Sequence, residues 1–166
     1  MKSSAKGNRR TRCDLVIAED EENIALVLGQ VIRDAIPEIR IEFAKDGLEA
    51  LSKIETLRPC IVWTCIRMPR LNGLDLIKAI RKDPKLKKKR IVVCTGYAGE
   101  EMNNLAIESG ADVFMSKGDI CTENRFEIHV LSAIARCLLW LAVPSSYQSF
   151  KRNATRSRKA DKRDGG

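Results

Sequence analysis

The chain has 166 residues, of which 44% are hydrophobic and 31% are charged, a balance typical of a folded globular domain. Its formal net charge is +8, but residues 1–13 and 144–166 each carry +5, which leaves −2 for residues 14–143. The mildly acidic body argues against a basic nucleic-acid-binding fold. We therefore expect a basic, flexible segment (1–13), one domain (14–143) and a basic, disordered tail (144–166).

Several classes of protein are excluded early. No apolar run approaches the roughly 20 residues of a membrane span, and the basic N-terminus lacks the apolar stretch of a secretory signal. The six cysteines form no CxxC pair and no zinc-like spacing, and His129 is the only histidine. We expect reduced thiols, a cytoplasmic location and no histidine-based metal site.

Strand and helix patterns alternate along the body. A continuous apolar run at 15–18 predicts a strand buried on both faces, and strict alternation at 39–43 predicts a strand at a sheet edge. Gly110 suits the C-cap of the helix before it. The predicted strands are at 15–18, 39–43, 60–65, 91–95 and 112–116, and the predicted helices are at 24–35, 48–57, 74–80, 100–109 and 124–143.

This alternation predicts an α/β fold, a doubly wound parallel sheet with right-handed crossovers. An edge position for the second strand favours the flavodoxin-like strand order 2-1-3-4-5, with helices on both faces. In such sheets ligands bind beyond the carboxyl ends of the strands, where the first and third strands lie side by side. The residues that end the strands are therefore the candidates for function.

Polar and nucleophilic side chains follow four of the predicted strands. Glu19 and Asp20 follow the first strand, Cys65 ends the third, Thr95 ends the fourth and Lys117 follows the fifth. Adjacent carboxylates favour a cation, and a lysine with a hydroxyl can hold phosphoryl oxygens. The set predicts a phosphoryl or metal–phosphate site.

The sequence resembles the receiver domains of two-component response regulators. The resemblance is carried by LVIAEDEENIAL (15–26), AKDGLEAL (44–51), IRMPRLNGLDLIKAIRKDP (66–84), IVVCTGYA (91–98) and GADVFMSK (110–117). It implies that Glu19 and Asp20 help to hold Mg²⁺ together with the backbone carbonyl of Arg67. It also implies that Thr95 is the switch hydroxyl, Phe114 the switch aromatic and Lys117 the phosphoryl-binding lysine.

One departure changes what the resemblance implies. The residue before the IRMP stretch is the phosphoacceptor aspartate in the family, and here it is Cys65. A thiol offers no hard oxygen, so we expect weakened Mg²⁺ binding, a mostly neutral thiol and a Lys117 that pairs with the acids. Gly118 stands where the family usually has proline, which loosens the loop that carries Lys117.

These features predict a non-enzymatic, single-domain receiver in two-component (phosphorelay) signalling that acts by protein contacts without aspartyl phosphorylation. The resemblance implies a histidine kinase, a phosphotransfer protein or a downstream target as partner. The last helix is apolar on more than one face, which favours a homodimer or partner contact there, with Phe114, Met115 and Trp140 on the same surface.

Three alternatives stay open. The chain is an ordinary Mg²⁺-dependent phospho-receiver whose aspartate was engineered to Cys65, or Cys65 is a thiol switch, or the basic tail binds nucleic acid. The tail offers only Tyr147 and Phe150 as aromatics and there is no second-domain helix-turn-helix, so a solvated flexible tail is favoured over one that binds nucleic acid.

Overall fold

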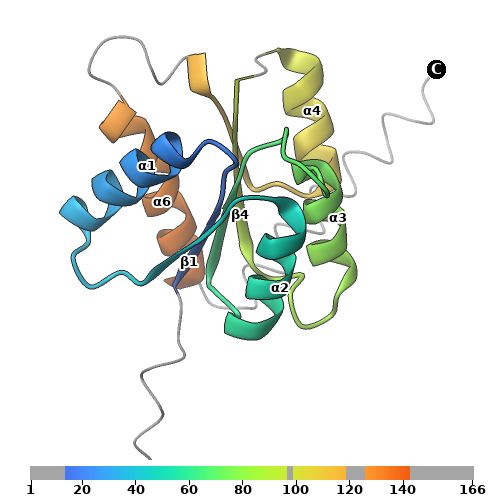
Figure 1. Cartoon of the computed structure of the whole chain (residues 1–166), viewed down its shortest axis with the longest axis horizontal. Helices are drawn as coiled ribbons and strands as arrows, with labels where there is room; N and C mark the ends of the chain where they lie inside the picture. Colours follow the sequence, from blue (N-terminus) through green and yellow to red (C-terminus); the bar gives the residue numbers. More distant parts are fainter. Residues whose placement is uncertain (1–13, 97–98, 119–125, 143–166) are drawn as a thin grey trace, which may run out of the picture. The chain divides into compact units, whose positions relative to one another are not determined.

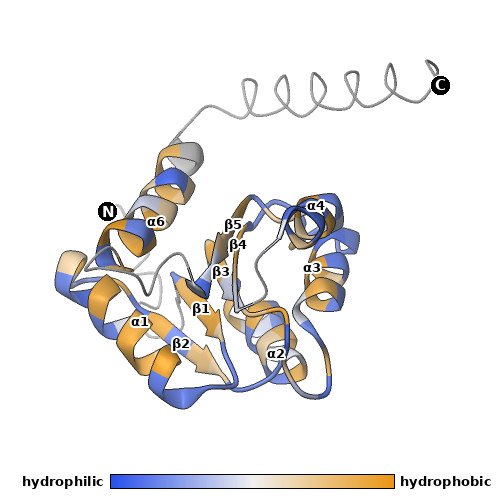
Figure 2. Ribbon diagram, turned by 90° about the horizontal axis from the view of Figure 1, so that it is seen from above, coloured by the Kyte–Doolittle hydropathy of each residue, from blue (hydrophilic) through white to orange (hydrophobic). Residues whose placement is uncertain are grey.

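The computed structural model describes residues 14–96, 99–118 and 126–142. Five parallel strands form one sheet in the order β2-β1-β3-β4-β5, which confirms the predicted topology (Figure 2). The strands are β1 (Leu15–Ala18), β2 (Ile41–Ala44), β3 (Ile61–Thr64), β4 (Arg90–Thr95) and β5 (Val113–Ser116).

Helices cover the two faces of the sheet. In Figure 1, α1 lies on one side of the strands, and α2, α3 and α4 lie on the other. The described helices are α1 (Glu22–Ala35), α2 (Gly47–Leu57), α3 (Gly73–Lys82), α4 (Glu100–Ser109) and α6 (Phe126–Ala142).

The sheet is central because its inner strands are apolar on both faces. Every residue of β1 and β3 is buried, including the large side chain of Trp63. One face of β1, β3 and β4 packs with α2, α3 and α4 into a continuous hydrophobic cluster. Strand β2 buries only Ala44 fully and exposes Glu42, as expected for a strand at the edge.

The helix ends at Gly110 and Asp46 are capped, the first as predicted and the second without having been predicted. Gly110 has φ 113° and receives the end of α4, where a side chain would also collide with Arg81. Asp46 accepts hydrogen bonds from the backbone N–H groups of Leu48 and Glu49 at the start of α2. These two caps fix the turn from β2 into α2 and the turn from α4 into β5.

Several element boundaries differ by one or two residues from the sequence prediction; β3, for example, ends at Thr64, so Cys65 follows the strand and does not end it. β2 begins at Ile41, because Ile39 is held in a turn by a hydrogen bond to the carbonyl of Ile36. β4 begins at Arg90, one residue before the strand predicted at 91–95. The guanidinium of Arg90 lies 2.6 Å from the carboxylate of Asp112, so a partly buried partner neutralises its charge inside the sheet.

The chain divides into two units, residues 1–133 and 134–166. The first unit contains the sheet, α1 to α4 and the first two turns of α6, where Val130 and Ala133 are buried and Ile128 is exposed. The predicted tails at 1–13 and 144–166, together with the side chain of Trp140, lie outside the described residues. None of the helices in the described ranges combines the length and apolar character of a membrane span.

Candidate functional site at the carboxyl edge of the sheet

The parallel register brings the ends of β1 and β3 together. Ala18 of β1 is paired with Thr64 of β3, so the next residues, Glu19 and Cys65, leave the sheet side by side. The backbone N–H of Cys65 donates to the carbonyl of Ala18 at 3.0 Å. The backbone N–H of Glu19 donates to the carbonyl of Ala44 at 2.9 Å on the other side. Both side chains therefore start from fixed backbone positions.

The loop after Cys65 is fixed from the start of α3. The backbone N–H of Gly73 donates to the carbonyl of Ile66 at 2.8 Å. A Cβ atom on Gly73 would lie 2.0 Å from the carbonyl oxygen of Cys65, so only glycine allows this close approach. The turn that aims the thiol thus depends on a residue eight positions later.

Three potential ligand atoms converge at this edge. One carboxylate oxygen from each of Glu19 and Asp20 and the Sγ atom of Cys65 all lie within 4.8 Å of one another. Glu19 and Cys65 are buried, with 2% and 4% of their surfaces exposed, whereas Asp20 is exposed. Among these three residues, solvent therefore reaches the cluster only at Asp20.

Lys117 closes the cluster from the end of β5. Its Nζ atom lies 2.9 Å from Oε1 of Glu19 and 3.2 Å from Oε1 of Glu21. The lysine thus pairs with the acids, as the sequence analysis expected. Glu21 is an addition, because the sequence shows it beside the acidic pair but nothing in the spacing marks it as a partner of a residue 96 positions away.

At this edge of the sheet, the environment shifts the pKa values of Cys65, Glu19 and Lys117. Burial, together with the charge of Glu19, raises the pKa of the Cys65 thiol above its ordinary value. Burial also raises the pKa of Glu19, although the hydrogen bond from Lys117 opposes this shift. Burial by itself would lower the pKa of Lys117, but the hydrogen bond and charge of Glu19 outweigh it and raise that pKa. At neutral pH the thiol is therefore protonated and the lysine is charged.

The other sequence-predicted residues lie near this cluster in the fold. Thr95 is buried at the end of β4, where it is paired with Ser116, the residue before Lys117. Phe114 is half-buried and packs against the core cluster. The backbone N–H of Arg67 donates to Cys65, and its predicted use as a carbonyl ligand stays a prediction.

Comparison with known proteins identifies the family. A family model described as the response regulator receiver domain matches residues 15–124. The chain belongs to this family. It is 38% identical over 104 residues to the chemotaxis protein CheY of Thermotoga maritima, a match that covers 62% of this chain and 83% of that protein.

Other relatives carry the receiver domain within longer proteins. The protein-glutamate methylesterase/protein-glutamine glutaminase 1 of Methanospirillum hungatei is 36% identical over 104 residues, which is 62% of this chain but 30% of that protein. The match therefore concerns the receiver domain and carries over no enzymatic activity.

Solved structures show the same fold. The chemotaxis response regulator CheY4 of Vibrio cholerae superimposes with a TM-score of 0.65 at 23% identity, covering 76% of this chain and 98% of that chain. A response regulator from Chloroflexus aurantiacus gives a TM-score of 0.68 at 23% identity, covering 77% and 98%.

Receiver domains commonly hold Mg²⁺ at acidic residues, and this receiver has Glu19 and Asp20 at its cluster. Mg²⁺ prefers octahedral oxygen ligands at about 2.1 Å and dehydrates reluctantly. Here one of the three converging donors is the sulfur of Cys65, and the oxygen Oε1 of Glu19 is already bound by Lys117. This set fits Mg²⁺ poorly.

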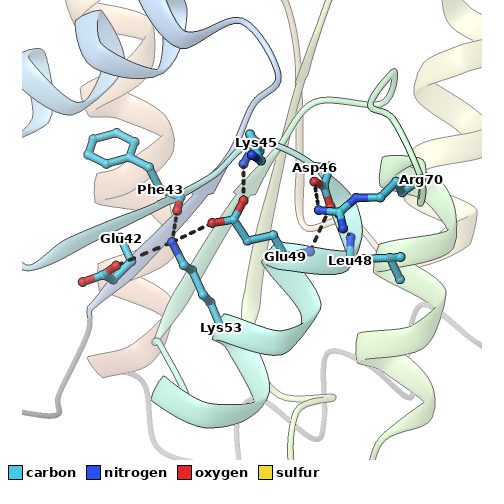
Figure 3. Close-up of polar contacts among 8 residues, drawn as sticks. All are labelled: Glu42, Phe43, Lys45, Asp46, Leu48, Glu49, Lys53 and Arg70. Atoms are coloured by element: carbon cyan, nitrogen blue, oxygen red, sulfur yellow. Dashed lines mark hydrogen bonds and ion pairs between the residues drawn. The ribbon is translucent and has the colours of Figure 1, made fainter.

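A second polar contact anchors the loop of this receiver domain, and the sequence analysis missed it. Arg70, which has a left-handed backbone with φ 65°, donates to the carboxylate of Asp46 (Figure 3). In the sequence, Asp46-Gly47 predicts a turn, and an aspartate before a helical pattern also signals an N-cap. No signal in the sequence links Asp46 to a residue 24 positions later.

Proposed function

We propose that this chain is a receiver module of two-component signalling that works through protein contacts and is not phosphorylated by the aspartyl route. The observation that carries the proposal is Cys65, which follows β3 beside Glu19 at the position where the resemblance expects the phosphoacceptor aspartate. The proposal assigns no catalytic activity to the chain.

The local chemistry supports this proposal. Phosphoryl transfer to a protein side chain needs an anionic nucleophile in line with the donor and a cation that spreads the developing charge. The raised pKa of Cys65 keeps its sulfur protonated, and a neutral thiol is a poor nucleophile. Lys117 is bound to Glu19 and Glu21, so its charge is already compensated.

Signal transfer would then depend on surfaces. We propose a histidine kinase, a phosphotransfer protein or a downstream target as the partner, contacted through α4, β5 and the start of α6. This face carries exposed apolar side chains, among them Leu105 on α4 and Ile128 on α6. Alternatively, the same region would contact a second copy of this chain and form a homodimer.

The test is incubation of the full chain with acetyl phosphate and Mg²⁺, followed by intact-mass measurement. The wild-type chain is expected to gain no phosphoryl mass. A phosphoryl group on Cys65, located by peptide mapping, would overturn the proposal.

The matched variant is Cys65→Asp, which restores a carboxylate beside Glu19 and Asp20. This variant is expected to gain one phosphoryl group, and to lose it when Mg²⁺ is removed by a chelator. If the variant gains a phosphoryl group and the wild type does not, the side chain at position 65 alone accounts for the difference. If neither protein is labelled, Cys65 is not what prevents phosphorylation, and the proposal, which rests on this side chain, fails.

A further inference from the structure

The receiver pocket contains a buried acceptor that lacks a partner. Oε2 of Glu19 is buried and receives no hydrogen bond from any residue in the described ranges. The side chain of Glu19 has 0% exposure, and its other oxygen is bound by Lys117. A buried carboxylate oxygen without a donor is costly, because it has given up water without replacement. A cation at this position would remove that cost.

The residue with this unpartnered oxygen, Glu19, lies in a cluster with the thiol of Cys65. Glu19, Asp20 and Cys65 each offer one ligand atom, and these atoms lie within 4.8 Å of one another. In a tetrahedral site with metal–oxygen distances near 2.1 Å and a metal–sulfur distance near 2.3 Å, ligand atoms lie about 3.6 Å apart. Small side-chain rotations would therefore bring all three atoms around one ion.

We propose that Glu19, Asp20 and Cys65 form a site for a thiophilic divalent cation of the Zn²⁺ class, in place of a Mg²⁺ site. Sulfur and carboxylate ligands together suit Zn²⁺ and Co²⁺, whereas Mg²⁺ takes oxygen ligands. Three protein ligands leave a fourth position for water on the exposed Asp20 side.

The charges of the bound state balance. When the sulfur–metal bond forms, Cys65 releases its proton to solvent. The three anionic ligands then face the dication and the ammonium of Lys117, which remains 2.9 Å from Glu19. The inner group is neutral, and Glu21 on the outside of Lys117 adds one negative charge without being a ligand. This inference does not depend on the proposed function, because it concerns the donor atoms and not the fate of a phosphoryl group.

Co²⁺ titration of the reduced full chain tests the site, because a cobalt–thiolate bond gives a near-ultraviolet charge-transfer absorption. The wild-type chain is expected to develop this band and saturate at one ion per chain. Zn²⁺ is expected to abolish the band, and a roughly hundredfold excess of Mg²⁺ is expected to leave it unchanged. No thiolate band, or displacement by Mg²⁺, would overturn the proposal.

Variants identify the ligands. Cys65→Ser and Cys65→Asp should both lose the band, whereas Cys60→Ser, which removes a half-exposed thiol at the other end of β3, should keep it. Glu19→Gln should weaken Co²⁺ binding by about tenfold or more. Glu21→Gln removes the same charge from a residue outside the cluster and should change the affinity far less. A band that survives both Cys65 substitutions, or equal losses for Glu19→Gln and Glu21→Gln, would contradict the assignment. Circular dichroism of each variant confirms that the fold is intact.

Discussion

At the scale of single residues, one side chain determines what this pocket can do. Cys65 occupies a position defined by backbone hydrogen bonds to Ala18 and by the close approach of Gly73, so its placement does not depend on its own chemistry. Its sulfur nevertheless changes the nucleophile, the ligand set and the charge of the pocket together. The thiol is buried beside Glu19, which makes a packed, protonated sulfur the state expected at neutral pH.

Alkylation kinetics test the state of this thiol. Because burial and Glu19 raise the pKa of Cys65, iodoacetamide at neutral pH should label it roughly tenfold or more slowly than the half-exposed Cys60. Peptide mapping at successive times measures both rates in one sample. Labelling in urea should remove the difference. Faster labelling of Cys65 than of Cys60 in the folded chain would instead support the thiol-switch alternative.

The loop behind the thiol should be sensitive to a single methyl group. In Gly73→Ala, the new Cβ would lie 2.0 Å from the carbonyl oxygen of Cys65, so the backbone must move. We expect a loss of about 1–3 kcal/mol in the free energy of unfolding, measured by urea denaturation. Gly96→Ala is the control, since a Cβ at Gly96 meets no atom within 4 Å. Equal stabilities of the two variants would contradict the geometry described here.

At the scale of elements, the start of α2 and the loop after β3 are tied together. Asp46 caps α2 and also accepts from Arg70, whose left-handed backbone directs its side chain across to that helix (Figure 3). In the same region Lys53 donates to the carbonyl of Phe43 and pairs with Glu49 at 3.0 Å. These contacts hold α2 to the edge of the sheet and to the loop that leads from Cys65 to α3.

The contact between Arg70 and Asp46 should make the free energy of unfolding depend on pH in the acidic range. The hydrogen bond from Arg70, with those from the backbone of Leu48 and Glu49, holds the pKa of Asp46 below its ordinary value of 3.8. The unfolded chain therefore binds this proton more tightly than the folded chain. The ionised carboxylate stabilises the fold above about pH 4, and this contribution is lost as the pH falls through the lowered pKa.

Arg70→Met tests this dependence, because it moves the pKa of Asp46 back toward its ordinary value. Between about pH 5 and about pH 3, the urea midpoint of the wild type should fall more steeply than that of Arg70→Met. Lys78→Met is the control, since its ion pair with Asp75 is half exposed on both sides and should contribute little. Parallel pH profiles for the wild type and Arg70→Met would contradict the assignment.

At the scale of the whole molecule, the question is which surface transmits a signal. The described part of the first unit exposes apolar side chains on α1, on α4 and at the start of α6, including Leu26, Leu105 and Ile128. Scattered exposed apolar residues are common, so exposure alone selects no surface. The proposal favours α4, β5 and the start of α6 because the last helix carries more apolar residues than one buried stripe requires.

Size-exclusion chromatography with light scattering tests the homodimer. The wild-type mass should rise from one chain toward two as the protein concentration increases. Ile128→Lys places a charge on α6 at a side chain that is 65% exposed, and should keep the protein monomeric without a loss of stability. Leu26→Lys on α1 is the matched control and should still dimerise. A wild-type monomer at every concentration would end the homodimer form of the proposal.

The sequence by itself determined the architecture. Alternating apolar periods define strands and helices, and parallel strands joined by helices allow few arrangements, so the order 2-1-3-4-5 was predicted from the strict alternation of residues 39–43 and the continuous apolar runs of the inner strands. Strand ends are local features, so Glu19, Asp20, Cys65 and Lys117 could be named as candidates before any coordinates. The start of β4 at Arg90 was missed, because it depends on an ion pair with Asp112, which lies far along the chain and leaves no local pattern.

Only the tertiary structure decided which of these candidates touch. The register of β1 and β3 places the carboxylates beside the thiol, and β5 delivers Lys117 to Glu19 and Glu21. Burial then leaves Oε2 of Glu19 without a donor among the residues that the structure describes, and raises the pKa of Cys65 so that its thiol stays protonated at neutral pH. Contact distances and desolvation depend on segments that are remote in sequence, so no local pattern of residues contains them.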